Sequence, residues 1–233
     1  MNNKSLIKKV KNLPVPILPT MVGAFTLSNI YSGMGYTWVR HITAWAAIAV
    51  ILSYILKICF HFDTVKKEYS NTVPASLYAG FTMLTMLLGS YFYNASPVFG
   101  KTLWFVGLIL HAIQILVFTY NNVIKNFNMQ TFLPSWFVTY NGIMVSTVVG
   151  GVMNEPLIGK IVVYYGIAVF TVIIPFMIYR LAKHEIKDPV YHTQAILLAP
   201  SSLCLVSYLN FISTPNKFII YYLYCAVICA LIF

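Results

Sequence analysis

The segment that begins at Leu133 reads LPSWFVTYNGIMVST, and it indicates how the rest of the chain is built. A proline is followed by an uncharged apolar run in which small and hydroxyl residues recur. Three other segments share this character: VPILPTMVGAFTLSN from Val15, VPASLYAGFTMLT from Val73 and APSSLCLVSYLN from Ala199. The prolines Pro16, Pro74, Pro134 and Pro200 lie 58, 60 and 66 residues apart. This near-constant spacing indicates an internal repeat.

The composition shows whether these repeats lie in water or in a lipid bilayer. The chain has 233 residues, of which 59% are hydrophobic and 9% are charged, and its mean hydropathy is +0.77. Soluble domains carry about 45–50% apolar and about 25% charged residues. So few charges cannot cover a surface that faces water. The composition therefore excludes a soluble enzyme, a nucleic-acid-binding domain and a disordered segment, and it predicts an all-α polytopic membrane protein.

Apolar segments long enough for a bilayer, which takes about 20 residues per helix, recur along the whole chain. We expect about eight transmembrane helices, at Pro16–Tyr31, Ile42–Phe60, Pro74–Tyr93, Leu103–Tyr120, Pro134–Met153, Ile161–Tyr179, Ile196–Ile212 and Lys217–Phe233. Each repeat is then one helical hairpin. Two spans per repeat give all repeats the same orientation, so the hairpins form a parallel repeat. We expect residues 1–233 to form a single transmembrane domain. Its first part, residues 1–13, is expected to be a basic cytoplasmic segment.

The basic residues are distributed unequally between the predicted loops. With the N-terminus in the cytoplasm, 11 of them lie inside: Lys4, Lys8, Lys9, Lys11, Lys57, Lys66, Lys67, Lys125, Arg180, Lys183 and Lys187. Four lie outside: Arg40, Lys101, Lys160 and Lys217. This positive-inside bias predicts a multi-pass protein of the plasma membrane with a cytoplasmic N-terminus. The net charge of +10 thus reflects topology in a lipid bilayer, and no nucleic acid partner is expected.

Polar residues are concentrated on alternate spans. The four odd-numbered spans hold 17 Ser, Thr, Asn, Gln and His residues and the even-numbered spans hold six; glycines divide six to two. Proline, glycine and hydroxyl residues are tolerated in membrane helices that face protein or a water-filled cavity. We therefore expect the odd helices to form an inner ring around a pore. We also expect five prolines to kink them: Pro16, Pro19, Pro74, Pro134 and Pro200.

The side chains predicted to line this pore are hydroxyls, amides and two phenylalanines. They are Thr20, Phe25, Thr26, Asn29, Phe81, Thr82, Thr85, Thr139, Asn141, Ser146, Thr147, Ser202, Ser207 and Asn210. Hydroxyls and amides can donate hydrogen bonds to an anion, and the N-terminal end of a broken helix is electropositive. Phe25 and Phe81 are candidates for a plug. The alternative for each residue is ordinary helix–helix packing, which small and hydroxyl residues also favour.

Three stretches resemble a known family: LPVPILPTMVGAF from Leu13, FLPSWFVTYNGIMVSTVVGG from Phe132 and LAPSSLCLVSYL from Leu198. The chain is similar to the tellurite-resistance/dicarboxylate transporter family, which includes TehA-like proteins, plant slow anion channels and fungal malate or sulfite transporters. The resemblance implies ten helices in five hairpins around an anion path, in a homotrimer, with a gating phenylalanine on the ninth helix. Four hairpins fit the present sequence, so we expect the ninth and tenth helices to be missing after residue 233.

These patterns predict transport of small inorganic or organic anions by a channel or facilitated transporter. The alternatives are a C4-dicarboxylate, sulfite or tellurite-linked transporter, a non-conducting membrane fragment and an intramembrane enzyme. An enzyme needs ionisable groups that converge inside the bilayer, where His111 is the candidate; we expect His111 to make an interhelical hydrogen bond instead. Cys225 and Cys229 are four residues apart without further ligands nearby in sequence, so neither a metal nor another cofactor is expected.

Overall fold

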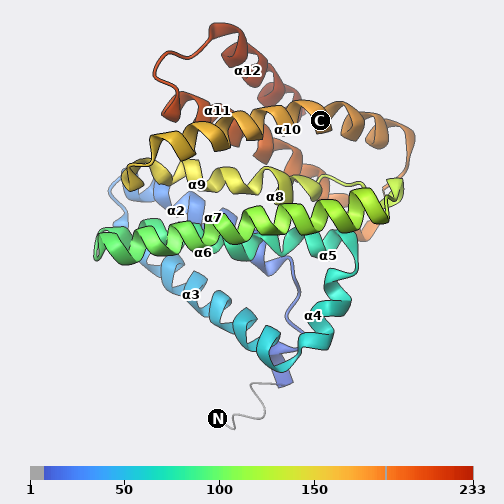
Figure 1. Ribbon diagram of the computed structural model, residues 1–233, viewed down its shortest axis with the longest axis horizontal. Coiled ribbons are helices and arrows are strands. Elements are labelled where there is room, and N and C mark those ends of the chain that lie inside the picture. Colours follow the sequence, from blue (N-terminus) through green and yellow to red (C-terminus); the bar gives the residue numbers. More distant parts are fainter. Residues whose placement is uncertain (1–7, 187, 233) are drawn as a thin grey trace. The chain divides into compact units, whose positions relative to one another are not determined.

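The computed structural model (Figure 1) describes residues 8–186 and 188–232, and this part of the chain contains helices and no strand. Residues 1–7 of the predicted basic segment, Lys187 and Phe233 lie outside the described residues. The chain divides into two compact units, one up to Leu110 and one from His111. Each unit is described by itself.

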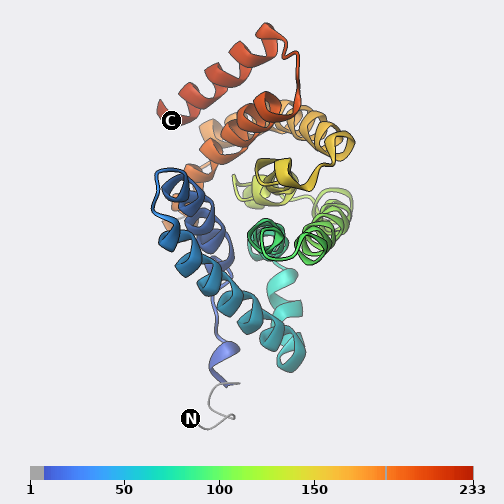
Figure 2. The ribbon, with the colours of Figure 1, turned by 90° about the vertical axis from the view of Figure 1, so that its left-hand side faces the viewer.

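The first unit contains two helical hairpins and the short helices that join them. Its elements are α2 (Ile17–Gly33), α3 (Thr37–Phe60), α4 (Phe62–Tyr69), α5 (Thr72–Leu77), α6 (Ala79–Tyr93) and the first part of α7 (Pro97–Thr119). Figure 2 shows α2 and α3 side by side, and α6 packs against α2. Gly35 has φ +95° in the turn between α2 and α3, a conformation that glycine adopts without steric cost.

Glycines allow α6 and α7 to approach closely. A Cβ atom placed on Gly100 would lie 2.5 Å from the Tyr93 Cα atom and 2.6 Å from the Gly89 carbonyl oxygen. A Cβ atom on Gly89 would lie 2.7 Å from the Trp104 backbone nitrogen. Small residues at such contacts are typical of membrane helices, whose association depends on close packing of the backbones.

The second unit continues from the end of α7. Its elements are η1 (Tyr120–Lys125), η2 (Met129–Thr131), α8 (Trp136–Tyr140), η3 (Gly142–Met144), α9 (Val145–Val148), η4 (Gly150–Met153), α10 (Pro156–Lys183), η5 (Asp188–Leu197), α11 (Leu198–Phe211) and α12 (Lys217–Ile232). Helix α11 packs against both α10 and α12, and it also contacts α9. The short helices of the fifth predicted span therefore lie against long helices of the same unit.

The fifth predicted span, Pro134–Met153, is not one continuous helix. It consists of α8, η3, α9 and η4, so α-helical turns alternate with 3₁₀ turns. Gly142 follows the Asn141 break, and two more glycines begin η4. Glycine destabilises a helix interior by about 0.8–1.0 kcal/mol relative to alanine, and asparagine side chains compete for backbone hydrogen bonds. The clustering of these residues accounts for the interruption.

Of the five prolines expected to kink odd helices, four lie at or just before helix starts, and Pro200 follows the 3₁₀ segment η5 closely; the kinks stay a prediction. Pro16 caps α2 and Pro19 lies in its first turn; Pro134 precedes α8. Pro74 and Pro200 are each the third residue of their helices, α5 and α11. A first-turn N–H has no intrahelical partner, so proline costs little there. By contrast, Pro175 lies inside α10, an even-numbered span.

The chain is an all-α polytopic membrane protein. Among the described residues five helices are long and apolar enough to cross a membrane: Thr37–Phe60, Thr72–Tyr93, Pro97–Lys125, Pro156–Lys183 and Thr193–Phe211. Helices α2, with 17 residues, and α12, with 16, are shorter. Seven of the eight predicted spans thus correspond to helices or pairs of consecutive helices, and the interrupted fifth span is the exception.

Burial differs between odd- and even-numbered spans. In the third span, Thr72–Tyr93, 78% of the most apolar stretch is buried. In the seventh span, Thr193–Phe211, the share is 39%. It is 22% in Thr37–Phe60, 33% in Pro97–Lys125 and 28% in Pro156–Lys183, which are even-numbered. The even helices are therefore less buried than the third span, whereas the seventh span differs from them only slightly. An inner ring around a pore stays a prediction.

Candidate functional site

Asn141 lies at the break in the fifth span, in the interior of the second unit. Its side chain is fully buried. The amide Nδ2 donates a hydrogen bond to the Gly166 carbonyl oxygen of α10 at 3.0 Å, and it lies 3.7 Å from the Cys204 Sγ atom of α11. Among the described residues the amide oxygen Oδ1 has no hydrogen-bond partner. Asn141 therefore joins the broken segment to two long helices and keeps one polar atom unused.

Two other predicted pore residues meet in the same unit. Thr147 of α9 and Ser207 of α11 are both buried, and their hydroxyl oxygens are hydrogen-bonded at 2.6 Å. The contact links the fifth span to the seventh. Hydroxyl pairs of this kind hold membrane helices together, so these two side chains serve the packing of the unit in this conformation.

Most of the other predicted hydroxyls bond to their own helices. Thr82 donates to the Ala79 carbonyl oxygen at 2.8 Å and Thr85 to that of Phe81 at 2.9 Å. Equivalent bonds to the preceding turn are made by Thr20, Thr26, Thr147 and Ser202. A hydroxyl has one proton to donate. In this conformation these groups therefore offer lone pairs, and a hydroxyl must rotate before it can donate to an anion.

The remaining predicted residues fall into buried and exposed groups. Thr139 and Ser146 are fully buried in the second unit, and Phe25 is buried in the first. The Phe25 ring contacts Tyr91 edge-on, with the ring centroids 6.3 Å apart. Asn29 and Phe81 are half-buried, whereas Thr20 and Asn210 are exposed. The two phenylalanines thus differ, because Phe25 is held by packing and Phe81 retains an accessible edge.

His111 makes the interhelical hydrogen bond expected from the sequence. It is fully buried near the middle of α7, and its Nε2 atom is hydrogen-bonded to the Thr139 carbonyl oxygen of α8 at 2.8 Å. A buried polar group usually needs such a partner, because leaving it unsatisfied costs about 1–3 kcal/mol. The bond gives His111 a structural role beside the broken segment.

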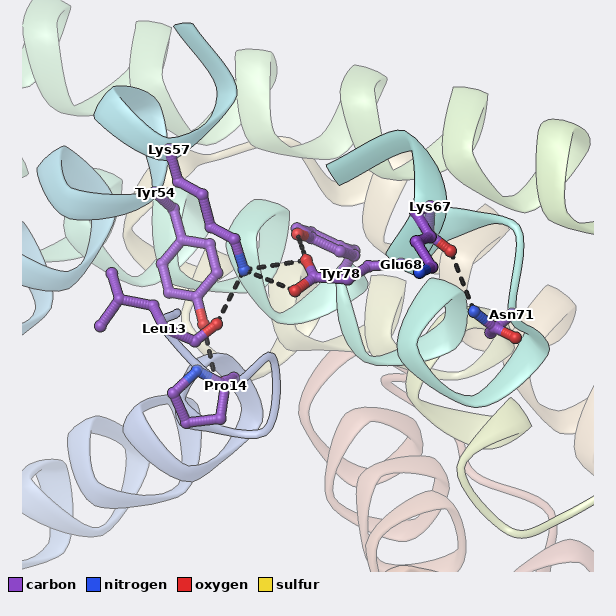
Figure 3. Close-up of polar contacts among 8 residues, drawn as sticks. All are labelled: Leu13, Pro14, Tyr54, Lys57, Lys67, Glu68, Asn71 and Tyr78. Carbon is purple, nitrogen blue, oxygen red and sulfur yellow. Dashed lines mark hydrogen bonds and ion pairs between the residues drawn. The ribbon is translucent and has the colours of Figure 1, made fainter. Parts of the chain in front are cut away.

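A polar cluster in the first unit was not predicted from the sequence (Figure 3). Lys57, near the end of α3, is fully buried and its ammonium lies 2.8 Å from both carboxylate oxygens of Glu68 on α4. The same ammonium donates to the Leu13 carbonyl oxygen at 2.7 Å. Tyr78 donates its hydroxyl to Glu68, and Tyr54 donates to the Pro14 carbonyl oxygen at 2.8 Å. The cluster therefore ties the chain before α2 to α3, α4 and the junction between α5 and α6.

The charged groups of this cluster bind one another and the backbone. Lys57 has three N–H donors and three acceptors at hydrogen-bond distance, so it has no donor left for a ligand. The Lys57 ammonium also lies 5.6 Å from the centre of the Tyr54 ring. Nearby, at the end of α4, burial raises the pKa of the Tyr69 phenol, which favours its neutral form. The sequence signal was a lysine inside an apolar span with a glutamate eleven residues later.

These features define a class of protein: a helical membrane protein whose polar side chains lie on buried, interrupted helices, as in proteins that move solutes across bilayers. The chain belongs to the voltage-dependent anion channel family (SLAC1), whose pattern it matches over residues 17–233. It is also 24% identical over 169 residues to the tellurite resistance protein TehA homolog of Haemophilus influenzae. That match covers 70% of this chain and 50% of the relative, so the chain spans about half the length of the curated relative it matches.

Proposed function

We propose that the chain carries small anions across the plasma membrane, along a path lined by the odd-numbered spans. The observation that carries the proposal is the match to the anion channel family over nearly the whole chain. The burial of the third and fifth spans supports it, because both combine hydroxyl or amide side chains with low exposure. The even spans, with their more exposed surfaces, are suited to lipid.

The interrupted fifth span is the best candidate for the selective part of this path. Irregular backbone at membrane depth is tolerated where it is buried in protein or lines a cavity, and transporters use broken helices to hold substrates. Asn141 brings an amide to the break, and rotation of that amide would turn its N–H₂ group from Gly166 towards an anion. Such a neutral donor binds weakly, which favours flux over capture.

The driving force comes from the membrane potential. An inside-negative potential favours outward movement of a monovalent anion by about 2.3 kcal/mol per 100 mV. The predicted spans contain no Asp or Glu, and transporters that couple to protons often depend on such carboxylates. Passive or facilitated movement is therefore our proposal. We further propose a cytoplasmic N-terminus, from the 11-to-4 charge bias, and a homotrimeric assembly, from the family resemblance.

A flux measurement on the purified full chain tests the proposal. Liposomes loaded with potassium chloride or nitrate are diluted into sulfate buffer, valinomycin is added, and anion efflux is followed with an ion-selective electrode. We expect efflux above that of protein-free vesicles. Sulfite, malate and tellurite as competing anions then distinguish the substrate classes, since the relative is named for tellurite resistance. No efflux from folded, correctly inserted protein would contradict the proposal.

An enzyme is the competing class, and His111 discriminates between the two. Replacement His111→Ala removes the hydrogen bond to the Thr139 carbonyl oxygen and the ionisable ring. If the folded variant conducts anions at an unchanged rate, transport does not depend on the His111 side chain. A requirement for His111 in a reaction that the wild-type chain catalyses would favour the enzyme.

A further inference from the structure

An apolar groove crosses the surface of the second unit. Its volume is about 450 Å³, and it lies between α10, α8 and the segment that runs from η1 to Phe132. Val123, Phe127 and Trp136 form one side, and Ala168, Val172 and Phe176 form the other. The volume falls within the range of about 300–1,000 Å³ that is typical of small-molecule sites. The lining is almost wholly apolar, so the groove fits a hydrocarbon ligand.

The groove is open along the exposed face of α10, a long apolar helix. Val172 and Phe176 are each 63% exposed, and Phe127 is 54% exposed. Helix α10 is apolar enough and long enough to cross the bilayer. From Ala168 to Phe176 the groove follows it for roughly 12 Å, at about 1.5 Å per residue. Hydrocarbon chains of the bilayer therefore have direct access to the groove.

Basic residues lie at one end of the groove, on the predicted cytoplasmic side. On α10, residues 169, 172, 173 and 176 share one face at helical spacing, and Arg180 and Lys183 continue that face. The Arg180 guanidinium is buried and donates to the carbonyl oxygens of Met129 and Gln130 at 3.4 and 3.3 Å. Arg180 thus fixes the end of the groove, while Lys125 and Lys183 remain exposed.

The exposed lysines give this end the charge that an anionic headgroup needs. Lys125 ends η1, two residues from the lining residues Val123 and Phe127. Lys183 ends α10. Glu185 is the nearest acid in the following loop, so positive charge predominates even when it is counted. An apolar channel with cations at one end is complementary to a phospholipid with a negative headgroup, which is enriched in cytoplasmic leaflets.

We propose that this groove binds one acyl chain of an anionic phospholipid, whose phosphate lies beside Lys125 and Lys183. The proposal goes beyond anion transport and does not depend on it, because lipid binding can be measured without flux. A bound lipid in this position would hold α10 against α8 and the loop after η1. It would therefore stabilise the unit that contains the interrupted fifth span.

Native mass spectrometry of the full chain tests the proposal. Protein extracted from vesicles that contain equal amounts of phosphatidylglycerol and phosphatidylcholine should retain phosphatidylglycerol preferentially. Ala168→Phe fills the groove and should abolish retention. Ile161→Phe is the matched control, since Ile161 is exposed on the same helix and does not line the groove; it should retain lipid as the wild type does.

A second pair of variants tests the headgroup contact without altering the groove. Lys125→Gln with Lys183→Gln should remove the preference for phosphatidylglycerol, and Lys101→Gln with Lys160→Gln, on the predicted outer side, should not. This pair remains decisive if Ala168→Phe fails to fold. Equal retention of the two lipids by the wild type overturns the proposal. So does a change of oligomeric state in Ala168→Phe with lipid retention unchanged, which would assign the groove to a second copy of the chain.

Discussion

The Lys57 ammonium lies 2.8 Å from both carboxylate oxygens of Glu68, and the lysine side chain is fully buried. Eleven residues separate the two in sequence, and the end of α3 and most of α4 lie between them. The ion pair therefore fixes how the chain turns from the first hairpin towards the second. The hydrogen bond from Lys57 to Leu13 brings the start of the first hairpin to the same point.

Replacing Lys57 with methionine should strongly destabilise the protein. Removal of one partner from a buried ion pair costs about 3–5 kcal/mol, because the other charge is left without compensation. Glu68 is one-quarter exposed, so we expect a loss near the lower end of this range. The measurement is the free energy of unfolding in detergent, with Lys66→Met, an exposed lysine on α4, as the control.

The double variant Lys57→Met with Glu68→Gln separates the charge effect from lost packing. It removes both charges, so it should recover part of the stability that Lys57→Met loses. Equal stability of Lys57→Met and Lys66→Met would show that the ion pair contributes nothing to the fold.

The two tyrosines of the cluster should differ in their contribution to stability. Tyr78 donates to the Glu68 carboxylate, whereas Tyr54 donates to the neutral Pro14 carbonyl. Hydrogen bonds to charged groups contribute about 1.5–3 kcal/mol and neutral ones about 1 kcal/mol. Tyr78→Phe should therefore lower the unfolding free energy more than Tyr54→Phe. The reverse order, measured under the same conditions, would contradict the charged character of the Tyr78 contact.

Gly100→Ala should disrupt the contact between α6 and α7. The new methyl group would meet backbone atoms of Tyr93 and Gly89, which cannot move aside as a flexible side chain can. Overpacking of this kind costs about 1–3 kcal/mol. Gly23→Ala is the control, because nothing lies within 4 Å of a Cβ atom there and alanine favours the helix. Thermal unfolding followed by tryptophan fluorescence compares the two; a Gly100→Ala midpoint at or above that of Gly23→Ala would contradict the close approach.

The sequence predicted the helices of this protein better than their interruptions. Hydrophobic length located seven helical segments, five of which are long and apolar enough to cross a membrane, because a bilayer imposes the same requirement on each span. The break at Asn141–Gly142 was present in the sequence as a dipeptide that favours turns, but the apolar residues on both sides favoured a continuous helix. Prolines were recognised as repeat markers. Whether they kink the helices stays a prediction, because a sequence cannot distinguish a first-turn proline from a kink until the start of the helix is known.

The candidate site was predictable only as a set of residue types. A sequence shows that Thr82 and Thr147 carry hydroxyls, but it does not show that each proton is directed to a carbonyl of the preceding turn. Lys57 was counted among the cytoplasmic charges, since its partner Glu68 lies beyond the end of the span. In both cases the missing information is three-dimensional, because it depends on which acceptor the fold brings within about 3 Å.

Substitutions on odd and even spans should affect anion flux differently. Asn141→Leu removes the amide from the break in the fifth span, and Thr82→Leu removes a buried hydroxyl from the third. A lost hydrogen bond to the anion costs about 1 kcal/mol. If the free-energy barrier to anion passage rises by that amount, passage slows by about fivefold. Ser53→Leu is the control, because Ser53 is only partly buried on the even helix α3 and bonds to the Ala49 carbonyl of the same helix. Efflux from liposomes with equal amounts of folded protein gives the comparison. Equal rates in all three variants would assign Asn141 and Thr82 to packing and remove the basis for an inner, polar path.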